Sequence, residues 1–306
     1  MTTDRPEISD LVIAFDPDTL ERLPARRDEI LATLEQHRMS AAARLVARWP
    51  HADGVLDARF VDGVLLRAHH ELQRLSEEFR QGERMRSLLV PLLDTLRRER
   101  VPGPYRIVDV GCGLGYVIRW LAAHGALGDD TRLIGCDYNA PFIAFATRLA
   151  AEEGLRCEFA VANAFRLSEP ATIFTSTGVI HHFRGESLDR FLGEQGGSGA
   201  SAFLHFDTKP SYLAPLGSWI FHQSRMREPL ARHDGVLSAV RAHSPAVLAS
   251  AARRTCPGFA VAVHDGEREI FPVLKVMLAL VGLRRDLQTT YLERLGPLSG
   301  RLGEFT

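Results

Sequence analysis

The first hundred residues carry the hydrophobic spacing of amphipathic helices. Apolar residues recur at steps of three and four positions in two stretches, which places each set on one helix face. The first set is Val64, Leu65, Ala68, Leu72, Leu75 and Phe79, and the second is Met85, Leu88, Leu89, Leu92, Leu93 and Leu96. Gly82 separates the sets, and Pro91 inside the second predicts a kink or a helix start. The breaker VPGP at 101–104 then predicts a domain boundary.

Beyond residue 104 the pattern changes to short apolar runs that alternate with helical stretches. The runs predict strands at 106–110, 131–136, 157–161, 171–175 and 202–206. Helical stretches at 116–123 and 141–153 separate the first three runs. Strands that alternate with helices form βαβ units, so this part of the chain is expected to adopt an α/β fold with a mostly parallel sheet.

The remaining segments are assigned from composition and from helix signals. The glycine-rich stretch 193–200 predicts a flexible loop. Residues 210–245 mix aromatic residues and arginines without a clear period, which indicates an insertion that covers a site. A helix over 244–254 opens with Ser244 at its cap and Pro245 in its first turn. The runs 259–264 and 270–280 predict two closing strands.

Composition and charge narrow the class of protein. The chain has 306 residues, of which 45% are hydrophobic and 25% charged, as in ordinary globular proteins. This excludes wholesale disorder and a collagen-like fibre. Lys and Arg total 37 against 38 Asp and Glu, a formal net charge of −1. No overall positive charge is therefore available to bind nucleic acid or an anionic membrane.

Cysteine usage and the N-terminal segment indicate a cytoplasmic protein. The four cysteines Cys112, Cys136, Cys157 and Cys256 lie far apart, which argues against a zinc site or a disulfide framework and favours a reducing compartment. The first ten residues lack the basic and apolar regions of a signal peptide. The longest apolar run, 271–283, is interrupted and too short to span a bilayer.

A glycine-rich turn follows the first predicted strand of the sheet. The segment 108–116 reads VDVGCGLGY, with Gly111, Gly113 and Gly115 between a strand and a helix. Glycines allow a sharp turn and a close approach of the backbone to a ligand. Their spacing is G-x-G-x-G, whereas the dinucleotide fingerprint is G-x-G-x-x-G. A nucleotide-like ligand is therefore predicted here, and a nicotinamide dehydrogenase is disfavoured.

A carboxylate follows the second predicted strand, in the segment GCDYN at 135–139. Asp137 stands at the carboxyl edge of the sheet, where open α/β folds bind ligands. A carboxylate there can accept hydrogen bonds from both hydroxyls of a ribose. An Asp after a strand often only caps a helix, but the glycine turn one βα unit earlier favours the ligand-binding interpretation.

Two later segments also follow predicted strands and are expected at the same edge of the sheet. VANAF at 161–165 follows the third predicted strand, and TSTGVIHHF at 175–183 follows the fourth. Together with VDVGCGLGY and GCDYN they resemble the class I S-adenosylmethionine-dependent methyltransferases. VANAF is similar to the adenine-contacting turn of that family. TSTGVIHHF is similar to a motif common among its members that act on small molecules. The resemblance covers roughly residues 105–280.

The resemblance implies an α/β, Rossmann-like, doubly wound and mostly parallel sheet with a helical N-terminal lid. The implied domains are a helical lid or accessory region at 1–104, a cofactor-binding domain at 105–283 and a helical tail at 284–306. The insertion at about 210–245 would cap the substrate. The implied cofactor is S-adenosylmethionine.

The resemblance also implies which residues bind the cofactor. They are Asp109, Gly111, Gly113, Gly115, Asp137, Tyr138, Asn163, Ala164, Phe165 and Thr177. The glycines and Asp109 would surround the methionine and the ribose, Asp137 would bind the ribose hydroxyls and Tyr138 would flank the adenine. Asn163 stands where the family usually has Asp, and its amide oxygen can still accept a bond from the adenine amino group.

Two histidines follow the fourth predicted strand. His181 and His182 stand where the Asn/Asp-Pro-Pro-aromatic signature of N-methyltransferases is absent. A buried histidine is usually a packing residue, but an imidazole at this edge can deprotonate a hydroxyl acceptor. The expected activity is therefore methyl transfer to a small organic molecule, with an oxygen acceptor favoured. One histidine is expected to face the acceptor, and the family pattern favours His182.

Alternative functions and partners remain open at this point. A protein that binds the cofactor without methyl transfer would keep the same motifs, and an RNA or protein methyltransferase is disfavoured by the near-zero net charge. His205, Asp207 and His222 could hold a metal, but three dispersed residues are weak evidence for a metal site and we expect none. The expected partner is a small methyl acceptor, with no nucleic acid or membrane, and the apolar N-terminal helices could pair two subunits.

Overall fold

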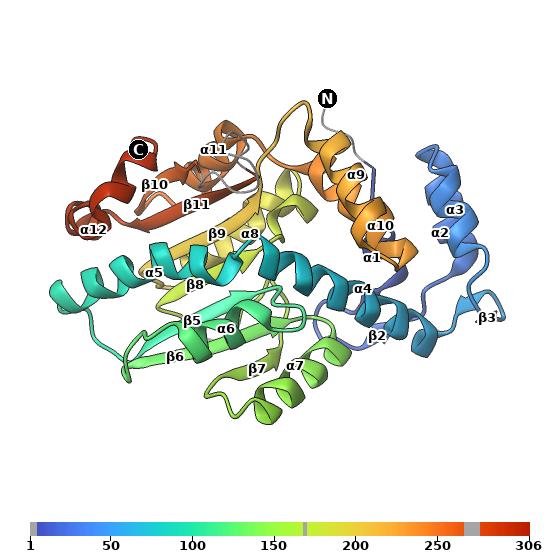
Figure 1. Cartoon of the computed structure of the whole chain (residues 1–306), viewed down its shortest axis with the longest axis horizontal. Helices are drawn as coiled ribbons and strands as arrows, with labels where there is room; N and C mark the ends of the chain where they lie inside the picture. Colours follow the sequence, from blue (N-terminus) through green and yellow to red (C-terminus); the bar gives the residue numbers. More distant parts are fainter. Residues whose placement is uncertain (1–4, 168–169, 266–275) are drawn as a thin grey trace. The chain divides into compact units, whose positions relative to one another are not determined.

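The computed structural model describes residues 5–167, 170–265 and 276–306 (Figure 1). The chain divides into two compact units, each with its own internal packing. The first contains residues 1–75 and 210–242, and the second contains residues 76–209 and 243–306. We call them the helical unit and the sheet unit.

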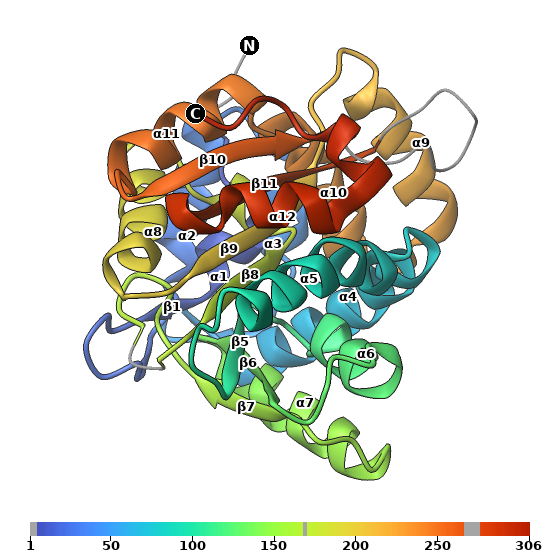
Figure 2. The ribbon, with the colours of Figure 1, turned by 90° about the vertical axis from the view of Figure 1, so that its left-hand side faces the viewer.

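A seven-stranded sheet forms the centre of the sheet unit, in the order β10-β11-β9-β8-β5-β6-β7, which Figure 2 shows from top to bottom. Its strands are β5 (Tyr105–Val110), β6 (Thr131–Asp137), β7 (Glu158–Val161), β8 (Ile173–Thr177), β9 (Ala202–Thr208), β10 (Phe259–His264) and β11 (Met277–Arg284). Strands β5 to β9 are parallel to one another, and β11 pairs antiparallel with both β9 and β10. The predicted mostly parallel, doubly wound α/β fold is confirmed.

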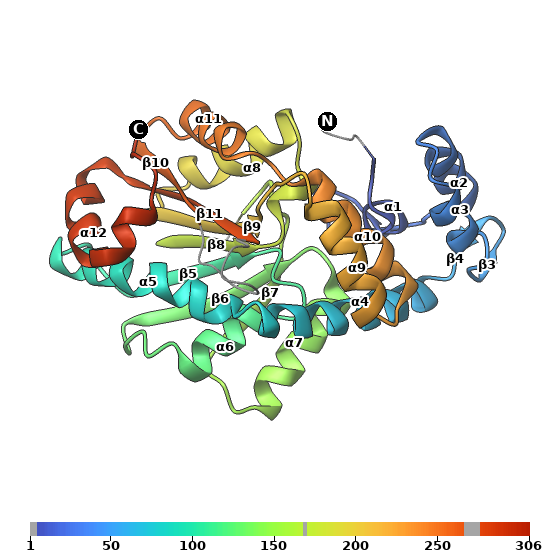
Figure 3. The ribbon, with the colours of Figure 1, turned by 45° about the horizontal axis from the view of Figure 1, so that its top comes forward.

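Helices cover both faces of this sheet (Figure 3). On one face α5 (Gln81–Arg98), α6 (Tyr116–His124) and α12 (Gln288–Leu295) pack in one core cluster with β5 and β9. On the other face α8 (Glu186–Gly197) and α11 (Pro245–Thr255) share a second cluster with β8 and β10. Helix α7 (Ala140–Glu152) packs against β6 and β7. The short 3₁₀ helices η2 (Arg285–Leu287) and η3 (Gly296–Arg301) flank α12.

The second apolar stripe of the sequence lies in α5, inside the sheet unit. All six of its members are buried there among the residues of the α5, α6 and α12 cluster. The structure thus divides the chain near residue 75 rather than at VPGP 101–104, because this stripe packs on the sheet and not on the helices before it. Pro91 lies within α5, which starts ten positions earlier at Gln81 and so does not begin at the proline.

The helical unit is built from two segments that are distant in sequence. The first segment contains α1 (Ile8–Val12), β1 (Ala14–Phe15), β2 (Arg22–Leu23), α2 (Arg27–Gln36), α3 (Ser40–Val46), β3 (His51–Ala52), β4 (Val55–Leu56) and most of α4 (Ala58–Glu78). The second contains α9 (Ala214–Arg225) and α10 (Pro229–Arg241). Asp234 of α10 accepts hydrogen bonds from the backbone N–H groups of Ile8 (3.0 Å) and Ser9 (2.9 Å), and so joins the segments.

Three local predictions differ from the structure. The glycine-rich stretch 193–200 is mostly the end of α8 rather than a loop, because Gly196 lets that helix lie directly against Cys256. The insertion 210–245 is regular, and consists mainly of helices α9 and α10. The last predicted strand is observed at Met277–Arg284, and residues 270–275 of that prediction lie outside the described residues.

Among the helices that the structure describes, none combines the length and apolar character needed to cross a bilayer.

Candidate active site

The glycine turn connects β5 to α6 at the carboxyl edge of the sheet. Gly111, Gly113 and Gly115 have positive φ values of 71°, 54° and 72°, a conformation that L side chains rarely adopt. A Cβ at Gly111 would lie 2.8 Å from Val179, and one at Gly115 would lie 2.3 Å from Phe159. Two of these glycines are therefore required by the fold itself, besides any ligand that approaches the turn.

Asp137 ends β6 and connects two turns of this edge. Its Oδ2 accepts the backbone N–H of Gly113 at 3.0 Å, and its Oδ1 accepts that of Asn139 at 2.9 Å. The residue is only 7% exposed. A carboxylate has about four lone-pair positions, and the backbone N–H of Tyr138 also acts on this one, so the side chain can still accept a hydroxyl. The side chain predicted to bind ribose is thus held in place and keeps its capacity to accept.

A second buried carboxylate lies next to it in the sheet. Asp109 of β5 is paired in register with Gly135 of β6 and Thr175 of β8. The hydroxyl of Thr175 donates to Asp109 Oδ1 at 2.8 Å. This hydrogen bond between neighbouring strands holds the carboxylate of the residue that lies two positions before Gly111.

Burial gives both carboxylates unusual acidities. It raises the pKa of Asp137 to about 6, against the opposing effect of the backbone N–H groups of Asn139, Gly113 and Tyr138 and of the charge of His182. It also raises the pKa of Asp109 to about 6, where the Thr175 hydroxyl lowers it and the charge of Asp137 adds to the increase. Two interacting acids with displaced pKa values at one sheet edge are typical of a functional site.

The other residues predicted to bind the cofactor surround the same edge. Tyr138 follows Asp137 and is 40% exposed. The amide oxygen of Asn163 accepts the backbone N–H of Phe165 at 2.9 Å, so it already stabilises the turn that also contains Ala164. The Phe165 ring packs edge-on against Phe183, with 5.0 Å between centroids.

Two buried polar atoms near these residues have no hydrogen-bond partner among the described residues. They are Thr177 Oγ1, at the end of β8, and Asn139 Nδ2, at the start of α7. Asn139 is 1% exposed and caps α7 without using its side chain. Buried orphan groups are costly, so a bound polar ligand would relieve them. This arrangement fits a ligand such as S-adenosylmethionine. The Asn139 side chain was not among the site residues predicted from the sequence.

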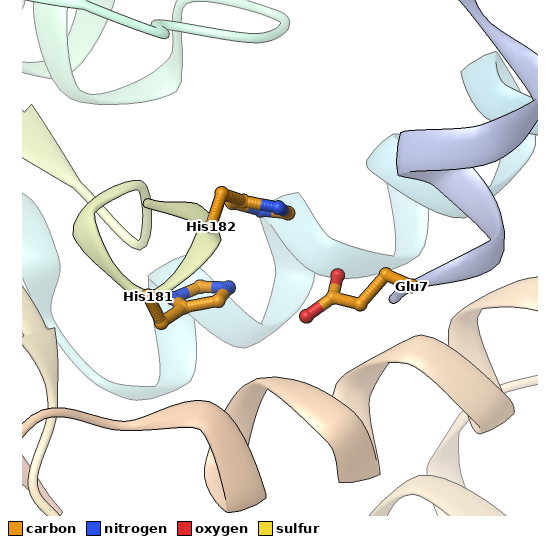
Figure 4. Close-up of side chains that lie close together, drawn as sticks. All are labelled: Glu7, His181 and His182. Carbon is orange, nitrogen blue, oxygen red and sulfur yellow. The ribbon is translucent and has the colours of Figure 1, made fainter. Parts of the chain in front are cut away.

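His181 and His182 lie on the 3₁₀ turn η1 (Ile180–His182), which follows β8. Figure 4 shows both rings projecting from this turn, and their centroids are 4.4 Å apart. Glu7, the third residue labelled there, belongs to the helical unit. His181 is buried, while His182 is half-buried. The pair thus lies at the edge that holds Asp137, as predicted from the strand order.

Asp207, near the end of β9, binds His181 at two points. Its Oδ2 accepts the His181 backbone N–H at 2.9 Å, and its Oδ1 lies 2.8 Å from His181 Nδ1. Oδ1 also accepts the N–H of Thr208 at 2.6 Å. Burial alone would raise the pKa of Asp207, but the His181 ring and these N–H donors outweigh it and hold the pKa below its usual value. From the sequence, Asp207 was considered together with His205 and His222 as a metal ligand, and its partner was not identified.

His205 is part of a separate buried chain of polar groups. Its Nδ1 lies 2.8 Å from the Ser176 hydroxyl, and its Nε2 lies 2.8 Å from Gln195 Oε1. Burial lowers the pKa of His205 to about 3 despite the charge of Asp207. With both ring nitrogens bound to protein groups, this histidine serves as a link between β8, β9 and α8 and does not suit metal binding.

Comparisons with known proteins agree with this geometry. Residues 107–195 match the family model described as a methyltransferase domain. A comparison with curated proteins found no match. Among solved structures, the plantazolicin methyltransferase BamL, bound to a triazolic desmethyl analogue and S-adenosylhomocysteine, is 14% identical. It has a TM-score of 0.50 over 73% of this chain and 96% of its own.

Two further solved structures show weaker similarity. Magnesium protoporphyrin IX methyltransferase ChlM from Synechocystis, with bound S-adenosylhomocysteine, is 14% identical with a TM-score of 0.44, over 84% of this chain and 99% of its own. A methyltransferase from Aquifex aeolicus is 14% identical with a TM-score of 0.43, over 68% and 97%. At these identities the similarity concerns the fold.

Proposed function

Because residues 107–195 match a methyltransferase domain, we propose that the chain is a class I S-adenosylmethionine-dependent methyltransferase that methylates an oxygen of a small organic molecule with a histidine as general base. The cofactor, when bound, supplies a methyl carbon already activated by a positive sulfur. The protein therefore has to bind the cofactor, align the acceptor and, for a hydroxyl, accept its proton. The observation that carries the proposal is the pair of imidazoles at the end of β8, on the edge that holds Asp137.

The cofactor side of the proposal uses the predicted residues. Asp137 would accept the ribose hydroxyls at the carboxylate positions that its backbone N–H donors leave available. Asp109 and the turn with Gly111, Gly113 and Gly115 would border the methionine and ribose. Tyr138, Asn163, Ala164 and Phe165 would border the adenine. Thr177 would approach the amino group, and its buried hydroxyl supports a polar ligand there.

The acceptor side uses His181 and His182. An alcohol or phenol is a poor nucleophile while its oxygen keeps the proton, so a base within hydrogen-bond reach accelerates its methylation. The oxygen forms a bond to the methyl carbon, the carbon–sulfur bond breaks with its electron pair going to sulfur, and the imidazole takes the proton and later releases it to water. A carboxylate acceptor would need no such base.

The helical unit is our candidate for the lid and acceptor-binding part. Its second segment, 210–242, leaves the sheet unit directly after β9, which carries Asp207. The chain returns at His243, whose Nε2 lies 2.8 Å from the Phe183 carbonyl, one residue after His182. The segment 210–242 thus leaves and rejoins the sheet unit near the histidines. This supports a role of the helical unit in acceptor binding.

The test is to incubate the protein with S-adenosylmethionine and matched acceptor panels of phenols, alcohols, thiols, amines and carboxylic acids. Release of S-adenosylhomocysteine and the mass of the product are measured. We expect turnover with hydroxyl compounds, and no turnover by the Asp137→Ala variant at low cofactor concentration. Product formed only from amines or carboxylates would contradict oxygen methylation with a base.

A further inference from the structure

We propose that Asp207 is a positioning residue that orients His181, so that His181 rather than His182 removes the proton of the acceptor. This inference rests on the proposed function and deepens it. It assigns the base to one imidazole of the pair, and it gives a role to a carboxylate on the neighbouring strand.

The hydrogen bonds around Asp207 fix which nitrogen of His181 carries hydrogen. An ionised carboxylate can only accept, so the contact of 2.8 Å to Oδ1 requires a hydrogen on His181 Nδ1. In a neutral imidazole the lone pair is then on Nε2, the nitrogen directed away from Asp207. Proton exchange with an acceptor would therefore occur at Nε2.

The backbone contact makes this orientation rigid. The same carboxylate accepts the N–H of His181 at 2.9 Å, so it holds both the main chain and the ring of one residue. His181 and Asp207 are each 4% exposed, which leaves little freedom for either side chain to rotate. A base held in one rotamer and one tautomer is ready to accept a proton without a prior rearrangement.

The buried anion also stabilises the product of proton transfer. When the imidazole takes a proton, the positive charge forms 2.8 Å from an oxygen of Asp207, in a site with little water. Opposite charges attract strongly there, so the ion pair favours the transfer. The low pKa of Asp207 keeps this carboxylate ionised at neutral pH.

His182 is placed for a different interaction. It is half-buried, and its charge acts on Asp137, whose pKa it lowers.

Replacing Asp207 with asparagine tests the orientation of His181, because Asp207 accepts three N–H groups. The bonds come from the His181 backbone, the His181 ring and Thr208. An amide has only one oxygen, so Asp207→Asn must present its NH₂ group to at least one of these donors. If the NH₂ group faces the ring, the hydrogen of the imidazole moves to Nε2 and the base is lost.

The first experiment reads the tautomer directly and needs no acceptor. Protein labelled with ¹⁵N-histidine is bound to S-adenosylhomocysteine, and long-range ¹H–¹⁵N spectra identify His181 by comparison with His181→Gln. We expect an Nδ1–H tautomer in the wild type, and its loss in Asp207→Asn. An Nε2–H tautomer in the wild type would overturn the proposal. This result does not depend on whether Asp207→Asn folds.

The second experiment is a double-mutant cycle on the hydroxyl acceptor found in the panel. Asp207→Asn should lower kcat by about 10²–10⁴-fold with KM for S-adenosylmethionine unchanged. In the His181→Ala background the same change should cost less than about twofold, because the ring it positions is already absent. Asp189→Asn, which removes a carboxylate paired with Arg254 on the surface, is the matched control and should retain full activity.

Two outcomes contradict the proposal. An equal loss of kcat from Asp207→Asn in both backgrounds, with a lower melting temperature, would mean that Asp207 only holds the turn. A larger loss of kcat from His182→Ala than from His181→Ala would assign the base to His182. If no hydroxyl acceptor is methylated, the proposed function fails, and the tautomer spectrum still decides how His181 is oriented.

Discussion

At the scale of single residues, Asp137 joins the binding of cofactor to the local fold. Replacing it with Ala removes the acceptor for the ribose hydroxyls and for the N–H groups of Gly113 and Asn139. Each charge-assisted bond lost costs about 1.5–3 kcal/mol, or about tenfold or more in affinity. Calorimetry with S-adenosylhomocysteine should therefore show at least tenfold weaker binding. Unchanged affinity would mean that Asp137 only stabilises the two turns.

The raised pKa of Asp137 makes cofactor binding depend on pH. Ribose hydroxyls donate to the ionised carboxylate, and the pKa of about 6 means that the free protein becomes protonated as the pH falls through that value. The affinity for S-adenosylhomocysteine should thus be several-fold lower at pH 5 than at pH 7.5. In Asp137→Asn, which has no charge to lose, calorimetry should show a flatter pH dependence.

The same acidities affect the stability of the free protein with the opposite sign. Asp109 and Asp137 have pKa values of about 6, above the ordinary value of 3.8, so the folded protein binds more protons than the unfolded chain between these values. The free energy of unfolding contributed by this pair should increase as the pH falls from 7 to 5. Denaturant titrations should show a smaller increase in Asp109→Asn than in the wild type, because the variant keeps only Asp137. An equal pH dependence of both proteins would contradict it.

Some residues of the site could be predicted from the sequence and others could not. The glycine turn and Asp137 lie at the ends of recognisable strands, so spacing alone locates them. The partner of His181 lies 26 positions away. Its identification needs the register of β8 against β9, in which Thr177 pairs with Phe206 and places Asp207 just beyond the end of β8. No periodic pattern in the sequence contains that register.

At the scale of elements, Gly82 shows how α5 is fitted to α6. A Cβ at this position would lie 2.2 Å from Cδ2 of Trp120. Ala favours helices over Gly by about 1 kcal/mol, but overpacking costs about 1–3 kcal/mol. Gly82→Ala should therefore fail to stabilise the protein, and Gly82→Leu should lower the free energy of unfolding clearly.

A matched control for this prediction lies in α8. A Cβ at Gly197 meets nothing within 4 Å, so Gly197→Ala should be neutral or stabilising. Denaturant unfolding of the variants measures the difference. Equal effects of Ala at the two positions would show that the contact with Trp120 is not tight.

The elements that the sequence misassigned share a physical cause. Gly82 suggested a helix break, but the break occurs at Arg80, which has a φ of 52°, and Gly82 lies inside α5. Gly196 likewise lies inside α8. In both helices the glycine allows a close contact with another element, a tertiary effect that local propensity does not contain. Alternating strands and helices were predicted well because their patterns are local.

At the scale of the whole molecule, the division into two units determines which truncations fold. Removing residues 1–100 deletes the α5 stripe from the core of the sheet unit, so the remaining chain should lose cooperative thermal unfolding. Removing only residues 1–75 keeps that core, and its unfolding should stay cooperative in calorimetry. Cooperative unfolding of the shorter chain would show that α5 is dispensable for the sheet.

The bond between Asp234 and the N–H groups of Ile8 and Ser9 also has a consequence for biosynthesis. A ribosome makes residues 5–75 before their partners in α10, which emerge only after the strands β5 to β9 have been made. During that interval the apolar stripe of α4 has no completed unit to pack in. Until α10 is released, residues 5–75 of the nascent chain should therefore bind a chaperone. Strands β5 to β9 can begin to form the sheet during this time, although they are made after residues 5–75.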